Sequence, residues 1–187
     1  MAGRPPDGGL LLRLQSHYGT AVSLTATHRS RRMTMPATPH RTYDVLGLLL
    51  KFRAFPSETN GKFCLVDCLV PPGLGAPPNA HPGEAECFIV SEGQFDFVIG
   101  ETTRRAGPGE IVVVPEGALH AFRCTGTAPG RVLIVNAPGK MHEVFFTGVG
   151  RPLPEETTAP QPPVGPPDIA RVLAVASAAG MQIPIPA

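Results

Sequence analysis

From Leu46 to Asn136 the sequence consists of short apolar segments, each ended by a turn rich in glycine or proline. In the first segment Leu50 and Phe52 alternate with Lys51 and Arg53, which is the period of two residues that a strand with one buried face shows. The chain has 21 Gly and 23 Pro, a usage typical of many short strands joined by tight turns. The segments that we predict as strands are 46–54, 63–70, 86–91, 95–99, 111–114, 120–124 and 131–136.

These strands are short and regularly spaced, and no helical pattern separates them, so we expect an all-β sandwich or a sheet closed into a barrel. Helical patterns follow the sheet, one at residues 140–146 and one at residues 168–179. In the second helix Asp168 can cap the first turn and Gly180 ends the helix. Its apolar stripe, expected to dock on the outside of the barrel, is Ile169, Val172, Leu173 and Ala176.

These patterns divide the chain into four parts. Residues 43–150 are predicted to form the barrel, residues 151–167 a proline-rich linker, and residues 168–187 a helix and tail packed on the barrel. Residues 1–35 hold five arginines before position 33 and a single acid. They are interpreted as a disordered extension or as a start assigned too early, with Met33 or Met35 as the true first residue. An arginine-rich transit peptide stays open as a third interpretation.

The balance of charges and the cysteines indicate which classes of partner and which cellular compartment to expect. Lys and Arg number 16 against 15 Asp and Glu, so there is no basic field for nucleic acid. The longest apolar runs are far shorter than the roughly 20 residues of a membrane-spanning helix. Cys64 and Cys68 share a predicted strand, which would hold them roughly 13 Å apart and out of disulfide reach. We therefore expect a cytoplasmic protein with neither nucleic acid nor membrane as a partner.

The first group of candidate site residues spans residues 79–86, after the predicted strand 63–70. Asn79 and His81 are two residues apart and share a face of an extended segment. Glu86 is five residues beyond His81 and would face the other way in an unbroken strand. Pro82 and Gly83 interrupt the strand, which allows Glu86 to return to the face of His81.

The second group is the segment from His120 to Cys124. Here His120, Phe122 and Cys124 share one face, and Arg123 takes the other. Since an arginine belongs in water, His120 is expected to point inward. Two imidazoles and one carboxylate suit a divalent transition metal, namely Fe, Mn, Ni, Co or Zn, with positions left for substrate or oxygen.

The spacing of these residues resembles the two sequence motifs of the cupin superfamily. The first motif is glycine, five residues, His, one, His, four, Glu, six, glycine, and the second is glycine, five residues, Pro, one, Gly, two, His, three, Asn. Eight of the ten positions agree over a region of roughly 46–138. Asn79 replaces the first His and Cys124 the last Asn. The matching residues are Gly73, His81, Glu86, Gly93, Gly109, Pro115, Gly117 and His120.

This resemblance implies a jelly-roll β-barrel of two antiparallel sheets with short C-terminal helices, and a metal held by His81, Glu86 and His120. The turn at 59–61 and the stretch 138–150 are similar to small single-domain cupins described as quercetin-dioxygenase-like. Asn79 occupies a ligand position, but its amide oxygen is a poorer donor than imidazole. A barrel that has lost its metal is therefore the alternative interpretation of the two histidines.

Several neighbouring residues have two interpretations. Glu84 could compete with Glu86 as a ligand, although solvent exposure fits it better. His142 could replace the missing ligand, but we expect a surface histidine. Cys124 could approach the metal or act as a nucleophile, although a small buried hydrophobe is the commoner role. The residues predicted to line a substrate pocket, with plain core as the alternative, are Phe88, Phe95, Phe97, Phe122 and Cys124.

The favoured function is a metal-dependent oxygenase, like quercetin 2,3-dioxygenase, that acts on a phenolic or other small organic substrate. In it Glu86 would serve as ligand and as catalytic base. The alternative is a non-catalytic cupin that binds a small ligand, which Asn79 favours. A sugar-type isomerase would need an acid and base pair that the sequence does not offer. Jelly-roll edges favour pairing, so we expect a homodimer.

Overall fold

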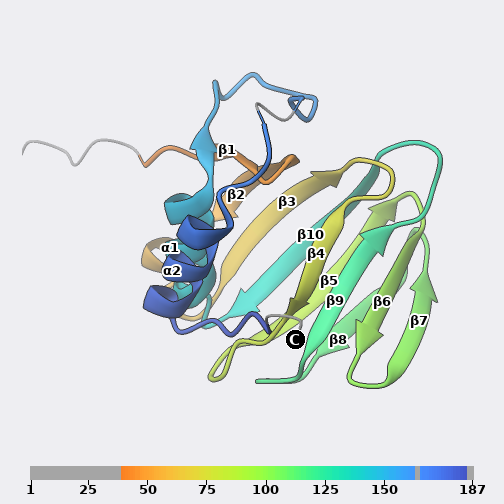
Figure 1. Cartoon of the computed structure of the whole chain (residues 1–187), viewed down its shortest axis with the longest axis horizontal. Helices are drawn as coiled ribbons and strands as arrows, with labels where there is room; N and C mark the ends of the chain where they lie inside the picture. Colours follow the sequence, from red (N-terminus) through yellow and green to blue (C-terminus); the bar gives the residue numbers. More distant parts are fainter. Residues whose placement is uncertain (1–38, 163–164, 185–187) are drawn as a thin grey trace, which may run out of the picture. The chain divides into compact units, whose positions relative to one another are not determined.

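The computed structural model describes residues 39–162 and 165–184, which form two antiparallel sheets and two α-helices (Figure 1). The sheets share one core, to which both contribute buried side chains, so the fold is the expected jelly roll. The seven-stranded sheet has the order β11-β1-β2-β3-β10-β5-β8. Its strands are β1 (Thr42–Val45), β2 (Leu48–Ala54), β3 (Cys64–Val70), β5 (Ala85–Glu92), β8 (Ile111–Val114), β10 (Gly130–Ala137) and β11 (Arg151–Pro152).

The four-stranded sheet has the order β4-β9-β6-β7. It lies on the right of the view in Figure 1, away from the helices. Two of its strands, β6 and β9, send phenylalanines into the core, as the alternation in the sequence predicts. Its strands are β4 (Gly75–Asn79), β6 (Phe95–Ile99), β7 (Thr102–Ala106) and β9 (His120–Cys124).

The first predicted strand is in fact half of a hairpin. Leu46 and Gly47 have φ angles of 54° and 89°, so they form a left-handed turn between β1 and β2. Tyr43 of β1 then pairs with Leu50 of β2. The strand predicted from residue 46 begins at Leu48, and β1 was not predicted.

Two further strands, β4 and β7, were also not predicted. β4 contains Pro77 and Pro78, and among the described strands it pairs only with β9. Proline is tolerated at such a sheet edge. β7 is the opposite edge of the same sheet, and four of its five residues are exposed. Neither segment therefore shows an alternating apolar pattern.

The helices are α1 (Lys140–Val149) and α2 (Ile169–Ala179), and a short 3-10 helix spans Pro56–Glu58. Asp168 caps α2 by accepting a hydrogen bond from the backbone N–H of Arg171 at 3.0 Å, and Gly180 ends the helix with a φ of 90°. Both caps are as predicted.

The apolar stripe of α2 packs mainly against α1, which in turn packs against β1 and β3 (Figure 1). Ala176 is buried in a cluster with Phe145 and Met181. Ile169 is 58% exposed, so the stripe docks less completely than expected. Among the described residues, no helix has the length and apolar character needed to cross a membrane. The interpretations of residues 1–35 fall outside the described residues.

Candidate metal centre

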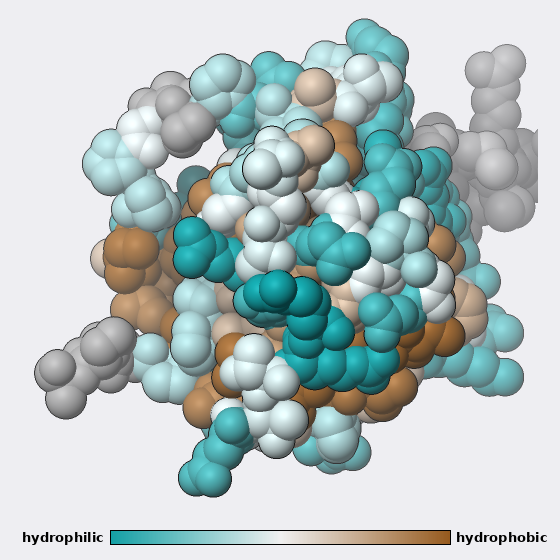
Figure 2. All heavy atoms as spheres, turned by 90° about the vertical axis from the view of Figure 1, so that its right-hand side faces the viewer, coloured by the Kyte–Doolittle hydropathy of each residue, from teal (hydrophilic) through white to brown (hydrophobic). Residues whose placement is uncertain are grey.

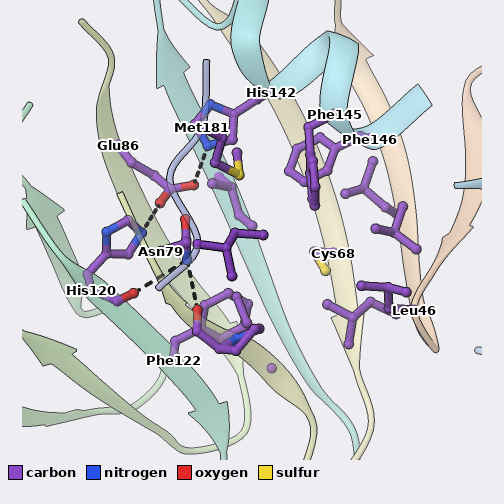
Figure 3. Close-up of a pocket in the computed structure, with 18 of the residues that line it drawn as sticks. Leu46, Cys68, Asn79, Glu86, His120, Phe122, His142, Phe145, Phe146 and Met181 are labelled. Atoms are coloured by element: carbon purple, nitrogen blue, oxygen red, sulfur yellow. Dashed lines mark hydrogen bonds and ion pairs between the residues drawn. The ribbon is translucent and has the colours of Figure 1, made fainter. Parts of the chain in front are cut away.

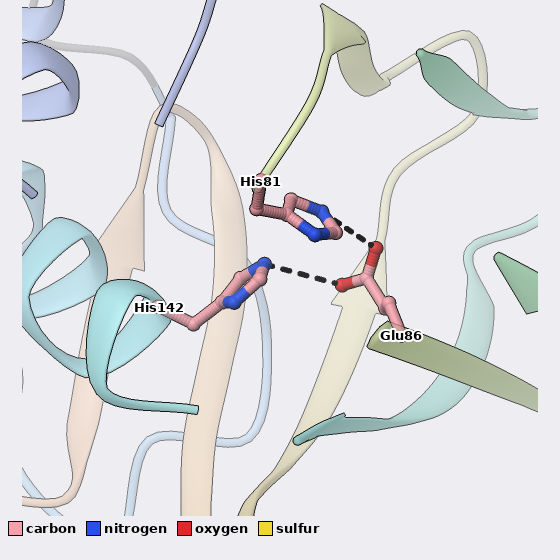
Figure 4. A group of neighbouring side chains, drawn as sticks. All are labelled: His81, Glu86 and His142. Carbon is pink, nitrogen blue, oxygen red and sulfur yellow. Dashed lines mark ion pairs between the residues drawn. The ribbon is translucent and has the colours of Figure 1, made fainter. Parts of the chain in front are cut away.

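Four ionisable side chains meet in the interior, each from a different part of the fold (Figures 3 and 4). His81 lies between β4 and β5, Glu86 on β5, His120 at the start of β9 and His142 in the first turn of α1. All four are at most 5% exposed. The structure thus brings the predicted trio of His81, Glu86 and His120 together and adds a third imidazole.

A tight turn explains how His81 and Glu86 come to face each other. Gly83 has a φ of 88°, and the backbone N–H of Glu84 donates to the carbonyl oxygen of His81 at 3.1 Å. The turn breaks the alternation that would otherwise place residues five apart on opposite faces. This is the interruption that Pro82 and Gly83 predicted.

Glu86 is the centre of the contacts. Its Oε2 lies 3.0 Å from Nε2 of His120 and 3.4 Å from Nε2 of His81. Its Oε1 lies 3.6 Å from Nε2 of His142 and accepts a hydrogen bond from Nδ2 of Asn136 at 2.8 Å. Asn136 is opposite Glu86 in the β10–β5 register, so the central strand fixes the carboxylate.

The other ring nitrogen of each histidine faces an oxygen that can only accept a hydrogen bond. Nδ1 of His81 is 3.1 Å from the carbonyl oxygen of Glu84, and Nδ1 of His120 is 2.9 Å from that of Ala118. Nδ1 of His142 is 2.6 Å from Oε2 of Glu84. These contacts assign the proton of a neutral ring to Nδ1, and its Nε2 then offers a lone pair toward Glu86.

Lone pairs and a carboxylate that converge in a buried site need a cation between them. Among the described residues Nε2 of His81 has no hydrogen-bond partner, because its contact with Glu86 has the distance of an ion pair without hydrogen-bond geometry. A protonated imidazole or a metal ion can supply the positive charge. The donor set is the nitrogen and oxygen mixture that divalent transition metals prefer, so the residues fit a metal. The ligand atoms of His81, Glu86 and His142 all lie within 4.8 Å of one another.

The pKa values of the metal-free site follow from the same contacts. Burial raises the pKa of Glu86, but its close contacts with the His120 and His81 rings and the charge of His142 outweigh this effect, so this pKa lies well below its usual range. Burial lowers the pKa of His81, but the adjacent Glu86 carboxylate leaves it above its ordinary value. The site therefore favours an ionised carboxylate beside a positive charge.

Two predictions about neighbouring residues were wrong. Glu84 is 3% exposed, where a solvated side chain was expected, because His142 and the backbone N–H of Met141 bind its carboxylate. His142 is 2% exposed and does not lie on the surface. It shares a helical face with Phe145 and Phe146, and this period of three and four residues in the sequence was the signal that could have placed it inside.

Residues 66–136, which contain most of this site, match the family model Cupin_2, described as a cupin domain. The chain carries a cupin domain. Over 94 residues it is 31% identical to the putative germin-like protein 3-2 of Oryza sativa subsp. japonica, covering 45% of this chain and 42% of the relative. Nectarin-1 of Nicotiana langsdorffii x Nicotiana sanderae is 28% identical over 97 residues, covering 47% and 42%. The chain thus spans about half or less of the curated relatives that it matches.

Solved structures similar to this cupin include an RmlC-like cupin from Shewanella frigidimarina, with 20% identity and a TM-score of 0.49. That alignment covers 56% of this chain and 89% of the other. A predicted oxalate decarboxylase from Thermotoga maritima has 17% identity and a TM-score of 0.49, and the alignment covers 56% and 98%.

Asn79, which replaces the first His of the cupin motif, makes hydrogen bonds within the four-stranded sheet. Its Nδ2 donates to the carbonyl oxygen of Pro77 at 2.9 Å and to that of His120 at 3.4 Å. Asn79 also faces His120 in the β4–β9 register. The amide therefore ties the edge strand to the strand that carries His120.

A cavity of about 100 Å³ opens beside the polar cluster of this cupin (Figure 3). Of the residues predicted to form a pocket, Phe88 and Phe122 line it, whereas Phe95, Phe97 and Cys124 lie in the closed core. Burial raises the pKa of Cys68 on the cavity wall to about 12, so this thiol stays neutral. The other apolar lining residues include Leu46, Leu48, Leu50, Ile134, Phe145, Phe146, Val172, Met181 and Ile183.

Proposed function

We propose that this protein is a metal-dependent cupin oxygenase, similar to quercetin 2,3-dioxygenase, that acts on a small phenolic or other organic substrate. One observation carries the proposal: the Nε2 atoms of His81 and His120 converge with the Glu86 carboxylate in a buried site that borders an apolar cavity. Such a site can hold an ion and an apolar molecule side by side.

His81, Glu86 and His120 would hold the ion, which is Fe, Mn, Ni, Co or Zn. A bound ion would supply Lewis acidity and, if redox-active, electron transfer to dioxygen. The protein fixes the ligands: backbone oxygens of Glu84 and Ala118 orient the rings, and Asn136 orients Glu86. The pKa of Glu86 lies below its usual range despite the opposing effect of burial, so its carboxylate is ionised and available to a cation.

The cavity favours an aromatic substrate. Phe88 and Phe122 have ring centroids 5.2 Å apart at its wall, and aliphatic side chains cover the remaining surface. An aromatic ring bound here would contact apolar atoms on most sides, while its hydroxyl groups could reach the polar cluster.

Dioxygen uptake tests this proposal. Protein reconstituted with Fe(II), Mn(II), Ni(II), Co(II) or Zn(II) is mixed with a panel of flavonols and catechols in an oxygen electrode. We expect uptake with at least one pair of metal and substrate, and a loss of more than about 100-fold in His81→Ala. A protein that holds metal but consumes no dioxygen with any substrate would contradict the oxygenase.

That outcome would favour the second candidate, a cupin that binds a small ligand without turnover. Asn79 supports this alternative, since its amide nitrogen is engaged by backbone oxygens where the family motif has an imidazole. Ligand affinity measured by calorimetry would then be independent of the metal.

We also propose a cytoplasmic location and a homodimer. The four cysteines are free in the described structure, which suits a reducing compartment. β8 is an open sheet edge, and its Ile111 and Val113 are 51% and 60% exposed. Figure 2, seen from the right-hand side of Figure 1, shows hydrophobic surface beside hydrophilic surface. The mass in solution by light scattering tests the pairing, and a monomer would rule it out.

A further inference from the structure

We propose that His142 of α1 is a metal ligand, with Glu84 as the carboxylate that positions it, so that the ligand missing at Asn79 is supplied from a helix. The inference rests on the proposed metal centre and deepens it. It assigns a role to two buried residues that the barrel alone does not need.

The distances suit coordination by one ion. Ligand atoms about 2.1 Å from a tetrahedral metal lie about 3.4 Å apart. The contact between Nε2 of His142 and Oε1 of Glu86 is 3.6 Å, close to the 3.4 Å between Nε2 of His81 and Oε2 of Glu86. The rings of His81 and His142 have centroids 4.3 Å apart, and both nitrogens point at Glu86 (Figure 4).

The hydrogen bonds of Glu84 prepare His142 as a ligand. Oε2 of Glu84 lies 2.6 Å from Nδ1 of His142, and its Oε1 accepts a hydrogen bond from the backbone N–H of Met141 at 2.8 Å. A carboxylate that binds Nδ1–H leaves Nε2 free and makes it more basic. Glu84 is therefore a positioning residue that acts through His142.

A structural ion pair is the competing explanation of the same contact. A pair of Glu84 and protonated His142 would fasten α1 to the turn between β4 and β5 and would need no metal. It would, however, direct Nε2–H toward Glu86 and leave the Nε2 of His81 without a partner among the described residues. One metal ion could bind Nε2 of His142, Nε2 of His81 and the Glu86 carboxylate at once.

Coordination by His142 would link the metal to the helical pair. α1 packs against α2 through a cluster that contains Phe145 and Ala176. The tail after α2 returns to the site, where the backbone groups of Ala80 and Gln182 exchange two hydrogen bonds of 2.8 Å beside His81. A metal ligated by His142 would therefore hold α1, α2 and the tail against the barrel.

Cobalt binding to the full-length protein tests the inference without reference to activity. Co(II) is titrated into the metal-free wild type and variants, and affinity and the visible absorption bands, which report the number and type of ligands, are recorded. We expect His142→Ala to lose more than about 100-fold in affinity and to change the spectrum, and E84Q to lose about 10- to 100-fold. Val144→Ala, at an exposed position of the same helix, should match the wild type.

A double variant separates a ligand from a structural histidine. N79H/H142A should recover Co(II) affinity to within about 10-fold of the wild type, since it places an imidazole at the position of the family motif. A structural pair would not be rescued in this way. Circular dichroism of each metal-free variant verifies that it is folded.

Two results would overturn the inference in different ways. If folded His142→Ala binds Co(II) with the affinity and spectrum of the wild type while His81→Ala does not, His142 is no ligand and the proposed metal centre stands. If the wild type binds no Co(II), the inference and the metal centre fail together.

Discussion

The core of the barrel has two halves that are filled in different ways. In the aromatic half, ring centroids lie between 5.0 and 6.3 Å apart and no ring is more than 7% exposed. In the polar half, a carboxylate and three imidazoles cluster together, and Glu86, His120 and His142 border a cavity of about 100 Å³. The aromatic half consists of Phe88, Phe95, Phe97 and Phe122, and the polar half of His81, Glu86, His120 and His142.

The difference separates what folding requires from what function requires. Close packing of apolar rings stabilises the barrel without any ligand. Burial of a carboxylate costs free energy unless a positive charge accompanies it. The side chains around an open cavity also lack the dispersion contacts of a filled core. The aromatic half therefore contributes to stability without a ligand, and the polar half has the composition that fits a bound cation.

The largest effect on stability is expected in the aromatic half. Phe97 is 1% exposed, so Phe97→Ala should lower the free energy of unfolding by about 3–5 kcal/mol through lost burial and a residual cavity. Urea denaturation measures this. Val98→Ala, on the outer face of the same strand at 39% exposure, should change it by less than about 0.5 kcal/mol.

The metal content of the same variants tests whether the two halves have separate roles. Folded Phe97→Ala should hold as much metal per molecule as the wild type. A large loss of metal in folded Phe97→Ala, with little loss of stability, would show that the two halves do not have separate roles.

A smaller effect, on the order of 1 kcal/mol, is expected from pH in the metal-free polar half. The pKa of His81 is raised because the adjacent Glu86 carboxylate outweighs its burial. A raised pKa in the folded state adds stability below the ordinary pKa, and this stability is lost as pH rises through the raised value. Urea denaturation should therefore show the wild type losing stability as the pH rises above the ordinary imidazole pKa of about 6.5.

Glu86→Gln is the matched variant for this pH dependence. It removes the carboxylate, keeps the side-chain volume, and offers amide N–H groups to the free Nε2 atoms. The decline in stability above the ordinary imidazole pKa should then be absent. A wild type whose stability does not fall as the pH rises above that value would show that His81 and Glu86 are not coupled.

Much of the fold could be predicted because the sequences of core strands show which of their residues are buried. β3, β6, β8, β9 and β10 alternate or form apolar runs, and the caps of α2 are local signals at Asp168 and Gly180. β4 and β7 could not be predicted, since edge strands with prolines or exposed polar residues have no such pattern. The turn at Leu46 and Gly47 depends on positive φ angles that a leucine rarely adopts.

The site was predictable only where its residues belong to the barrel. His81, Glu86 and His120 follow from the spacing around short strands and a turn. Glu84 was misjudged because its burial depends on how α1 docks, a long-range contact with no local signal. For His142 the spacing to Phe145 and Phe146 was a local signal, but it does not show which face of the helix docks on the barrel. Phe95 and Phe97 point inward as predicted, but the alternation cannot tell a cavity wall from closed core.

Metal content is the most direct test of the central claim that this cluster is a metal centre. Wild type, His81→Ala and His40→Ala, which removes a histidine outside the site, are purified without added metal, reconstituted and measured by elemental analysis. We predict about one equivalent of Fe, Mn, Ni, Co or Zn in the wild type and in His40→Ala, and almost none in His81→Ala. A wild type that stays empty after reconstitution, or a His81→Ala variant that retains a full equivalent, would contradict the account.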